Sequence, residues 1–176
     1  MNTPVVLITG ALTGIGRAAA IAFAKKGAKV VVAGRRDEAG KALAKELRSF
    51  GSEAEFINAD VRKEDDVRAM VDKTVARFGR LDVAVNNAAT EGQGGPITDQ
   101  TAESFAATFE TNVLGVVLSM KHEVRAMQAQ WQHHQHLLDL WARGRGRGLD
   151  LRRSQTRRGR HHQVGGARTR QVGNSR

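Results

Sequence analysis

A glycine-rich turn near the N-terminus has the residue types that bind a phosphate. It reads Thr9-Gly10-Ala11-Leu12-Thr13-Gly14-Ile15-Gly16 and follows a short apolar run at residues 5–8. Gly10 allows the positive φ with which a chain leaves a strand sharply, and Gly14 and Gly16 have no Cβ to keep a diphosphate away from the backbone amides. A helical pattern starts at this turn, and at a helix N-terminus unpaired N–H groups and the helix dipole favour an anion.

The glycines are spaced GxxxGxG, which differs from the GxGxxG of the general dinucleotide fingerprint, so the neighbouring elements matter more than the spacing. A helix follows the turn, Gly27 ends it, and residues 28–33 form a second apolar strand within the length of one strand–helix–strand unit. The turn therefore predicts a dinucleotide site that includes Gly10, Thr13, Gly14, Ile15 and Gly16. The alternative is an ordinary glycine-rich turn from strand to helix.

Two arginines follow the second strand, in the order Ala33-Gly34-Arg35-Arg36. In folds of this type a carboxylate at this position binds the ribose 2′-hydroxyl of NAD, whereas an arginine pairs with the 2′-phosphate of NADP. The strand ends without an acid, and the guanidinium of Arg35 offers a planar fork to a phosphate, so the sequence favours NADP, with NAD as the alternative. Both arginines could instead be solvated loop charges that Asp37 partly neutralises.

The elements that must hold these groups alternate along residues 1–130. Apolar strands are expected at 5–8, 28–33, 53–58 and 81–86, and amphipathic helices at 17–26, 37–50 and 63–78. This alternation predicts an α/β fold, a Rossmann-type doubly wound parallel sheet with right-handed crossovers and helices on both faces. A Gly-rich loop at 91–96 and a long helix over 112–130 follow. No strand pattern comes after that helix, so we expect the sheet to stop at its fourth strand.

Polar residues follow the third and fourth of these strands. Asp60 comes after the third strand, and Asn86 and Asn87 close the fourth. Ligands of doubly wound sheets bind at the carboxyl ends of the strands, so these residues are expected near the glycine turn. Asp60 could equally cap the helix that follows it, and the two asparagines could be simple turn formers.

The composition changes at residue 131. Residues 1–130 hold 17 Lys and Arg against 16 Asp and Glu, whereas residues 131–176 hold 11 Arg, no Lys and two Asp, so the net charge of +10 lies mainly in this tail. The tail contains the run Arg143-Gly144-Arg145-Gly146-Arg147-Gly148 and little to bury, so we expect it to be disordered and to bind nucleic acid only non-specifically. Its close histidines, His133, His134 and His136, could bind a metal adventitiously, and we expect no designed metal site.

The cellular location of the chain can be argued from its cysteine count and from the length of its apolar stretches. It has no Cys, which excludes disulfides and thiolate metal sites and fits a reducing compartment. We find no targeting segment and no apolar stretch that approaches the length of a membrane span. A cytoplasmic location without membrane association is expected.

Four motifs, in this order, resemble the short-chain dehydrogenase/reductase family over residues 4 to about 130. They are the TGxxxGxG loop that starts at Thr9, Asp60-Val61, Asn86-Asn87-Ala88-Ala89 where the family has NNAG, and Asn112 in Thr111-Asn112-Val113-Leu114-Gly115. The resemblance implies an NAD(P)-dependent oxidoreductase that transfers a hydride between the nicotinamide and a carbonyl or alcohol substrate. It also implies a homo-oligomer for an intact family member.

The resemblance also assigns roles to residues of this chain. It places Asp60 and Val61 at the adenine ring and adds Asn87, Ala88 and Ala89 to the cofactor site. It makes Asn112 the first member of the active-site set, where the family's asparagine holds a water beside the catalytic lysine. As an alternative, Asn112 could be an ordinary helix cap.

The family's other catalytic groups have no counterpart in this chain. The family uses a tyrosine as acid and base, a lysine four residues later and an upstream serine, but this chain has no Tyr and no Lys after Lys121. Because general acid–base catalysis contributes roughly 10²–10⁴-fold, we expect this chain to be inactive. The readings left open are an NADP-dependent oxidoreductase of which this chain is an incomplete form, a dinucleotide-binding remnant without turnover, and a nucleic-acid-binding protein that uses the Arg-Gly run.

The abrupt change at Trp131 leads to a hypothesis about the gene, namely that residues 131–176 are read in a shifted frame. Codon positions two and three of each tail residue, taken with position one of the next, permit tyrosine across Leu151 and Arg152. Across Gln155 and Thr156 they permit lysine or arginine, which is the family's Tyr-x-x-x-Lys spacing. The alternative is a genuine disordered Arg/Gly tail. The nucleotide sequence of codons 120–176 decides between them, since early stops in the shifted frame would contradict the hypothesis.

Overall fold

The computed structural model describes residues 3–144, with side chains for residues 3–132. The chain divides into two units at Gln135, and the fold described below is that of the first unit. Its strands are β1 (Val5–Thr9), β2 (Lys29–Gly34), β3 (Ala54–Asn58) and β4 (Val83–Asn86). The described helices are α1 (Gly14–Lys25), α2 (Asp37–Ser49), α3 (Glu64–Phe78), the 3₁₀ turn η1 (Ile97–Asp99), α4 (Ala102–Phe109), the π-helical turn η2 (Glu110–Leu114) and α5 (Gly115–Gly144), which begins in the first unit and ends beyond it.

The four strands form one parallel sheet in the order β3-β2-β1-β4. Thr9 at the end of β1 pairs with Ala33 of β2 on one side and with Asn86 of β4 on the other. The chain passes from β1 outwards to β2 and β3 and then returns to β4 on the opposite side of β1, so the strand order reverses between β1 and β4. In doubly wound sheets ligands bind in the crevice at this switch point. The predicted Rossmann-type doubly wound parallel sheet is confirmed.

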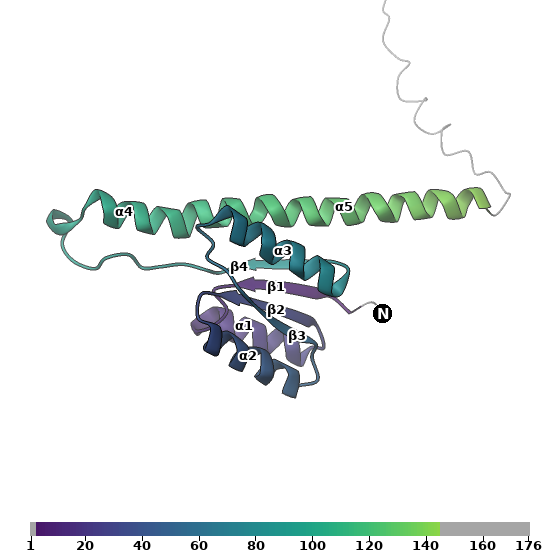
Figure 1. The fold of residues 1–176 in the computed structure, drawn as a ribbon, viewed down its shortest axis with the longest axis horizontal. Coiled ribbons are helices and arrows are strands. Elements are labelled where there is room, and N and C mark those ends of the chain that lie inside the picture. Colours follow the sequence, from purple (N-terminus) through teal and green to yellow (C-terminus); the bar gives the residue numbers. More distant parts are fainter. Residues whose placement is uncertain (1–2, 145–176) are drawn as a thin grey trace, which may run out of the picture. The chain divides into compact units, whose positions relative to one another are not determined.

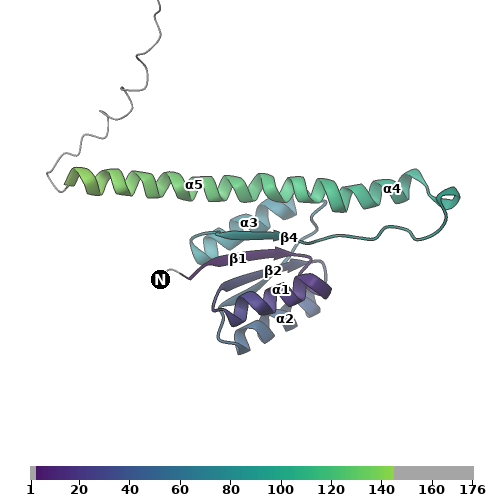
Figure 2. The same cartoon turned by 180° about the vertical axis from the view of Figure 1, so that it is seen from behind.

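Alternation of side chains along the strands gives the sheet two apolar faces. Val6 and Ile8 of β1 pack with α1 and α2, and Leu7 of β1 packs with α3. Figure 1 shows α1 and α2 together on one side of the sheet and α3 on the other, and Figure 2 shows the same layers from behind. This arrangement follows from right-handed crossovers, because the connection to β4 runs in the opposite direction from the first two.

The long helix extends further than the sequence analysis expects. It was expected over residues 112–130, but α5 begins at Gly115, after η2, and continues to Gly144. Because neither Gly nor Pro occurs between these two glycines, nothing in the sequence ends the helix earlier. The expected tail boundary at residue 131 therefore lies inside a helix. Residues 145–176 lie outside the described residues, so their disorder stays a prediction.

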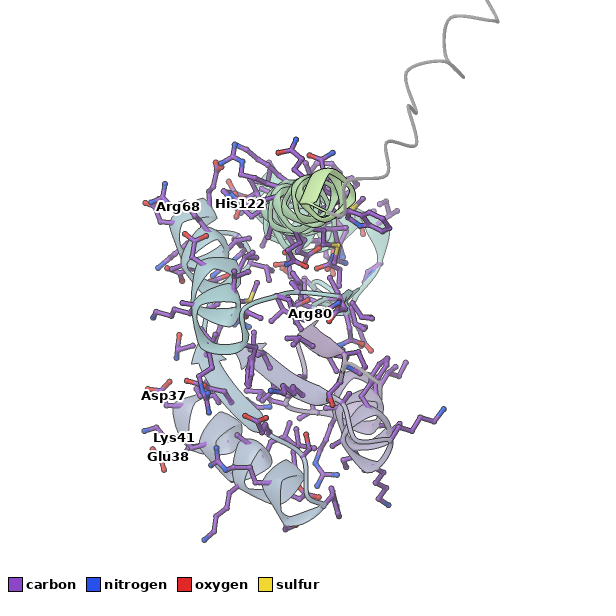
Figure 3. All side chains as sticks on the ribbon, turned by 90° about the vertical axis from the view of Figure 1, so that its right-hand side faces the viewer. Asp37, Glu38, Lys41, Arg68, Arg80 and His122 are labelled. Carbon is purple, nitrogen blue, oxygen red and sulfur yellow. The ribbon has the colours of Figure 1, made fainter. Side chains whose placement is uncertain are left out.

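Within the first unit α5 has two different faces. One face packs on the α3 side of the sheet through Leu118 and Met127, and His122 Nε2 lies 3.1 Å from Glu64 Oε1 where α5 meets α3 (Figure 3). On the other face, and in η2 before it, exposed apolar side chains are those of Val113, Leu114, Val117, Met120, Val124 and Trp131. In the described sheet β4 pairs with β1 alone. Open edges and apolar patches favour association, so aggregation of this chain stays a prediction.

None of the described helices is long and apolar enough to cross a membrane.

Candidate functional site

A cleft of about 170 Å³ opens at the carboxyl ends of the strands, beside the switch point. Thr9, Leu12, Ala33, Gly34, Ala59 and Thr111 form part of its wall. The residues of the expected site that line it are Gly10, Thr13, Arg35, Arg36, Asp60, Val61 and Ala88. The fold thus brings together the glycine turn, Arg35 and Arg36 after β2, and Asp60 after β3. Gly14, Ile15 and Gly16 belong to the same turn, whereas Asn87, Ala89 and Asn112 lie outside the lining.

Each glycine of the turn has a different surrounding. At Gly10, with φ +63°, a Cβ would lie 2.6 Å from the Cα of Ala88. At Gly16 a Cβ would lie 2.5 Å from Nδ2 of Asn87 and 2.6 Å from the backbone oxygen of Gly10. Gly14, with φ +54°, has no heavy atom within 4 Å of a Cβ position. Gly10 and Gly16 therefore let the protein pack closely on itself, and Gly14 leaves open space for a ligand.

The N-terminus of α1 is suited to an anion. Its N-cap, Thr13, makes no side-chain capping hydrogen bond, and the first turn of the helix has no acidic residue. The first N–H groups of a helix have no acceptor within the helix. These donors and the helix dipole therefore attract negative charge beside the open space at Gly14. Ile15 is 82% exposed next to them.

Thr9 and Asn87 join the end of β1 to the end of β4. The Asn87 Nδ2 atom donates to the backbone oxygens of Thr9, at 3.2 Å, and Gly10, at 3.0 Å. The buried Thr9 Oγ1 accepts from the backbone N–H groups of Asn87 and Ala88, both at 3.2 Å. These bonds hold the glycine turn in shape. Sequence analysis did not select Thr9, although a polar residue that closes an apolar strand is a usable signal.

Asn86 turns towards α5 and not towards the cleft. Its Nδ2 donates to Oε2 of Glu123 at 2.9 Å. Glu123 is buried, and this burial raises the pKa of its carboxyl group, which the hydrogen bond from Asn86 partly opposes. Among the described residues, Asn86 Oδ1, Ser119 Oγ and Glu123 Oε1 are buried without a hydrogen-bond partner. Asn86 therefore fastens α5 to β4 and takes no part in the cleft.

Asn112 lies inside η2, so it is not a helix cap. Its Oδ1 accepts from the backbone N–H of Thr90 and its Nδ2 donates to the backbone oxygen of Thr90, both at 2.8 Å. Both ends of the amide are thus used to hold the loop after β4, next to Ala89. In the π-helical turn the N–H of Gly115 bonds the oxygen of Glu110, a geometry frequent at functional sites. The structure places Asn112 as a positioning residue for this loop.

The carboxylate of Asp60 is bound by Arg62. Its Oδ1 accepts from the backbone N–H of Arg62 at 3.1 Å and from Nε at 3.0 Å, and its Oδ2 accepts from Nη2 at 2.6 Å. The side-chain bonds from Arg62, with a smaller contribution from the charge of Arg35, lower the pKa of Asp60 to about 2 against the opposing effect of burial. The N-cap of α3 is Lys63, so the alternative reading of Asp60 as that cap is wrong.

Asp60 is expected to make stability depend on acid pH. Its pKa in the folded protein, about 2, lies below the ordinary value of 3.8, so its ionised form favours folding. That contribution is fully present above the ordinary pKa and is lost as the pH falls through the folded pKa. Urea unfolding of the wild type and Asp60→Asn should show a difference in stability that shrinks as the pH is lowered from about 5 to about 2. A constant difference, or the same trend in the exposed control Asp65→Asn, would contradict this assignment.

In the part of the chain with described side chains, no three His, Cys, Asp or Glu residues are grouped as a metal site requires. The side chains of His133, His134 and His136 lie outside that part.

Comparison with known proteins identifies the family. The model of the short chain dehydrogenase family matches residues 4–134. The chain belongs to this family. An uncharacterized oxidoreductase of Thermotoga maritima is 45% identical over 126 residues, which cover 72% of this chain and 49% of the relative. An L-fucose dehydrogenase of Oryctolagus cuniculus is 46% identical over 111 residues, which cover 63% of this chain and 38% of the relative. The chain thus spans about half or less of the length of these short-chain dehydrogenase relatives.

Two solved structures of similar proteins show the same fold over the matched part. A short chain dehydrogenase/reductase from Burkholderia phymatum in complex with NAD superposes with a TM-score of 0.70 and 32% identity, over 73% of this chain and 46% of that one. An actinorhodin polyketide ketoreductase with NADPH gives a TM-score of 0.68 and 38% identity, over 70% of this chain and 47% of that one. The Rossmann-type sheet of this chain is therefore the sheet of its family.

Proposed function

We propose that this chain binds NADP(H) in the cleft beside the β1–β4 switch point, as the cofactor-binding part of a short-chain dehydrogenase that acts on a carbonyl or alcohol substrate. The observation that carries the proposal is that Arg35 and Arg36 line the same cleft as the glycine turn. The solved structures of similar proteins hold NAD in one case and NADPH in another, so both dinucleotides occur among the relatives.

The residues present fit such a dinucleotide. The N-terminus of α1 supplies N–H donors to a diphosphate beside the open space at Gly14. Arg35 and Arg36 take part in none of the ion pairs within the described part of the chain, so their charge is available to a 2′-phosphate. The neighbouring Asp37 accepts a hydrogen bond from Asn58 at 2.5 Å. The available charge of Arg35 and Arg36 favours NADP over the alternative, NAD.

We expect no turnover by this chain. A bound nicotinamide supplies hydride transfer, but the chain has no Tyr to act as the family's proton donor. Residues in and around the cleft bind and orient the cofactor. Asn87 and Thr9 hold the turn, and Asn112 holds the loop after β4. We therefore propose a dinucleotide-binding protein that does not reduce carbonyl compounds by itself.

Titration of the full chain with NADPH, followed by NADPH fluorescence, tests the proposal. We expect saturable enhancement, and Arg35→Glu should weaken NADPH by about 1.5–3 kcal/mol and NADH much less, because a charge-assisted pair is lost. The matched control is Arg68→Glu, since Arg68 lies on α3 outside the cleft lining, in an exposed pair with Asp65 (Figure 3). Equal weakening of NADPH and NADH would contradict the NADP assignment. Binding of neither dinucleotide would contradict the proposed function.

A further inference from the structure

We infer that Arg62 sets the preference for a phosphorylated dinucleotide by neutralising the carboxylate of Asp60 beside Arg35. This inference rests on the proposed dinucleotide site and extends it to a residue outside the cleft lining. Arg62 does not line the cleft, whereas Asp60 and Arg35 both do. Its role is that of a positioning and charge-compensating residue, not of a cofactor contact.

The fold places Asp60 and Arg35 at the same edge of the sheet. Gly34 of β2 pairs with Asn58 of β3, and the N–H of Ala59 donates to the oxygen of Gly34 at 3.1 Å. Arg35 and Asp60 therefore leave neighbouring strands side by side. An unpaired carboxylate at this position would act on a 2′-phosphate in two ways. It would repel the phosphate, and it would compete with the phosphate for the guanidinium of Arg35.

Arg62 prevents both effects through the geometry of its pair with Asp60. Side-chain N–H groups of Arg62 reach both carboxylate oxygens, with Nε at 3.0 Å from Oδ1 and at 3.1 Å from Oδ2, and with Nη2 at 2.6 Å from Oδ2. The Asp60 side chain is only 13% exposed and that of Arg62 36% exposed, so solvent screens this pair less than it screens the surface pairs of the chain. With both oxygens engaged, Asp60 makes no ion pair with Arg35.

Two acidic groups face Arg62. Asp60 binds it directly, and the charge of Glu110, at the start of η2, also acts on it. Removal of the guanidinium charge would leave both carboxylates uncompensated near the cleft. The position of Asp60 would not depend on that charge alone. The backbone N–H of residue 62 also donates to Oδ1, and the backbone N–H of Asp60 itself donates to Asp66 Oδ2 at 3.0 Å. A substitution at 62 therefore changes the charge and leaves the backbone bonds in place.

The test uses the full chain and measures dissociation constants for NADPH and NADH, and for the smaller probes 2′,5′-ADP and 5′-AMP. Arg62→Gln should weaken NADPH and 2′,5′-ADP about threefold to tenfold and change NADH and 5′-AMP by less than about twofold. Added salt should reduce this selective loss, because it is electrostatic. Arg62→Lys keeps the charge and should retain most of the preference. Arg68→Gln removes the same charge from an exposed pair on α3 and should not change the ratio of the two constants.

A second substitution separates charge compensation from a purely structural role. In the Arg62→Gln background, Asp60→Asn removes the carboxylate that needs compensation, so the preference for NADPH should return. If Arg62 only supported the loop, Arg62→Gln would weaken both dinucleotides equally, would lower the urea midpoint, and would not be rescued. The inference is overturned if Arg62→Gln leaves the ratio of the NADPH and NADH dissociation constants unchanged, or if the double variant does not regain the preference for NADPH. NADPH binding by the wild type would still support the proposed function in that case. A wild type that bound neither dinucleotide would overturn both.

Discussion

Gly10→Ala is expected to lower the free energy of unfolding by about 2–5 kcal/mol, because two separate costs add. The residue has φ +63°, a conformation that an L side chain adopts only with strain. The new Cβ would also lie 2.6 Å from the Cα of Ala88 and 2.9 Å from its backbone nitrogen. Backbone atoms cannot rotate away, and Ala88 is held by its bond to Thr9. Since a domain of this kind is stable by only about 5–15 kcal/mol, the variant should lose much of its stability.

Gly14→Ala is the matched control for this prediction. Gly14 has a similar φ, +54°, but nothing lies within 4 Å of its Cβ position. It should therefore show the backbone strain alone, about 1–2 kcal/mol, while its methyl group enters the open space and weakens dinucleotide binding. Urea unfolding followed by far-UV circular dichroism measures both variants. Equal losses of stability in the two would show that the contact with Ala88 costs nothing.

Thr9→Val is expected to destabilise the protein by about 1–3 kcal/mol, although it changes the volume little. Thr9 is 1% exposed, and its hydroxyl accepts the backbone N–H groups of Asn87 and Ala88. Valine would leave the half-buried N–H of Ala88 without an acceptor, which costs about 1–3 kcal/mol, whereas the N–H of Asn87 keeps its bond to the oxygen of Val85 at 3.1 Å. Because the same bonds set the position of Asn87, which holds the glycine turn, dinucleotide affinity should fall as well.

Thr9→Ser separates the hydroxyl from the methyl group at this position. Serine keeps the acceptor and loses one methyl group, at a cost of about 1 kcal/mol. Urea unfolding should therefore place Thr9→Ser between the wild type and Thr9→Val. A valine variant as stable as the serine variant would mean that the N–H of Ala88 finds another acceptor, and the proposed link between β1 and β4 would be wrong.

The sequence by itself determined the class of fold and the place of the site. Apolar strands and amphipathic helices alternate along the chain. Side chains repeat their direction every two residues in a strand and about every 3.6 residues in a helix, and these periods are local properties that can be read without coordinates. The glycine turn, the arginines after β2 and Asp60 are each next to an element whose type was predictable. Because parallel strands bring their carboxyl ends to one edge, the meeting of these residues in a cleft also followed from the sequence.

The tertiary structure alone decided which side chains bind each other. Adjacent asparagines illustrate this, since Asn86 turns to Glu123, 37 residues away, and Asn87 turns to Gly10, 77 residues away. Thr9 reaches Ala88 over 79 residues, and Asn112 reaches Thr90 from a π-helical turn that no local pattern indicates. Partners so distant are set by the packing of strands and helices on each other. Residue type shows that a polar group needs a partner, but the choice among many possible partners is a property of the folded chain.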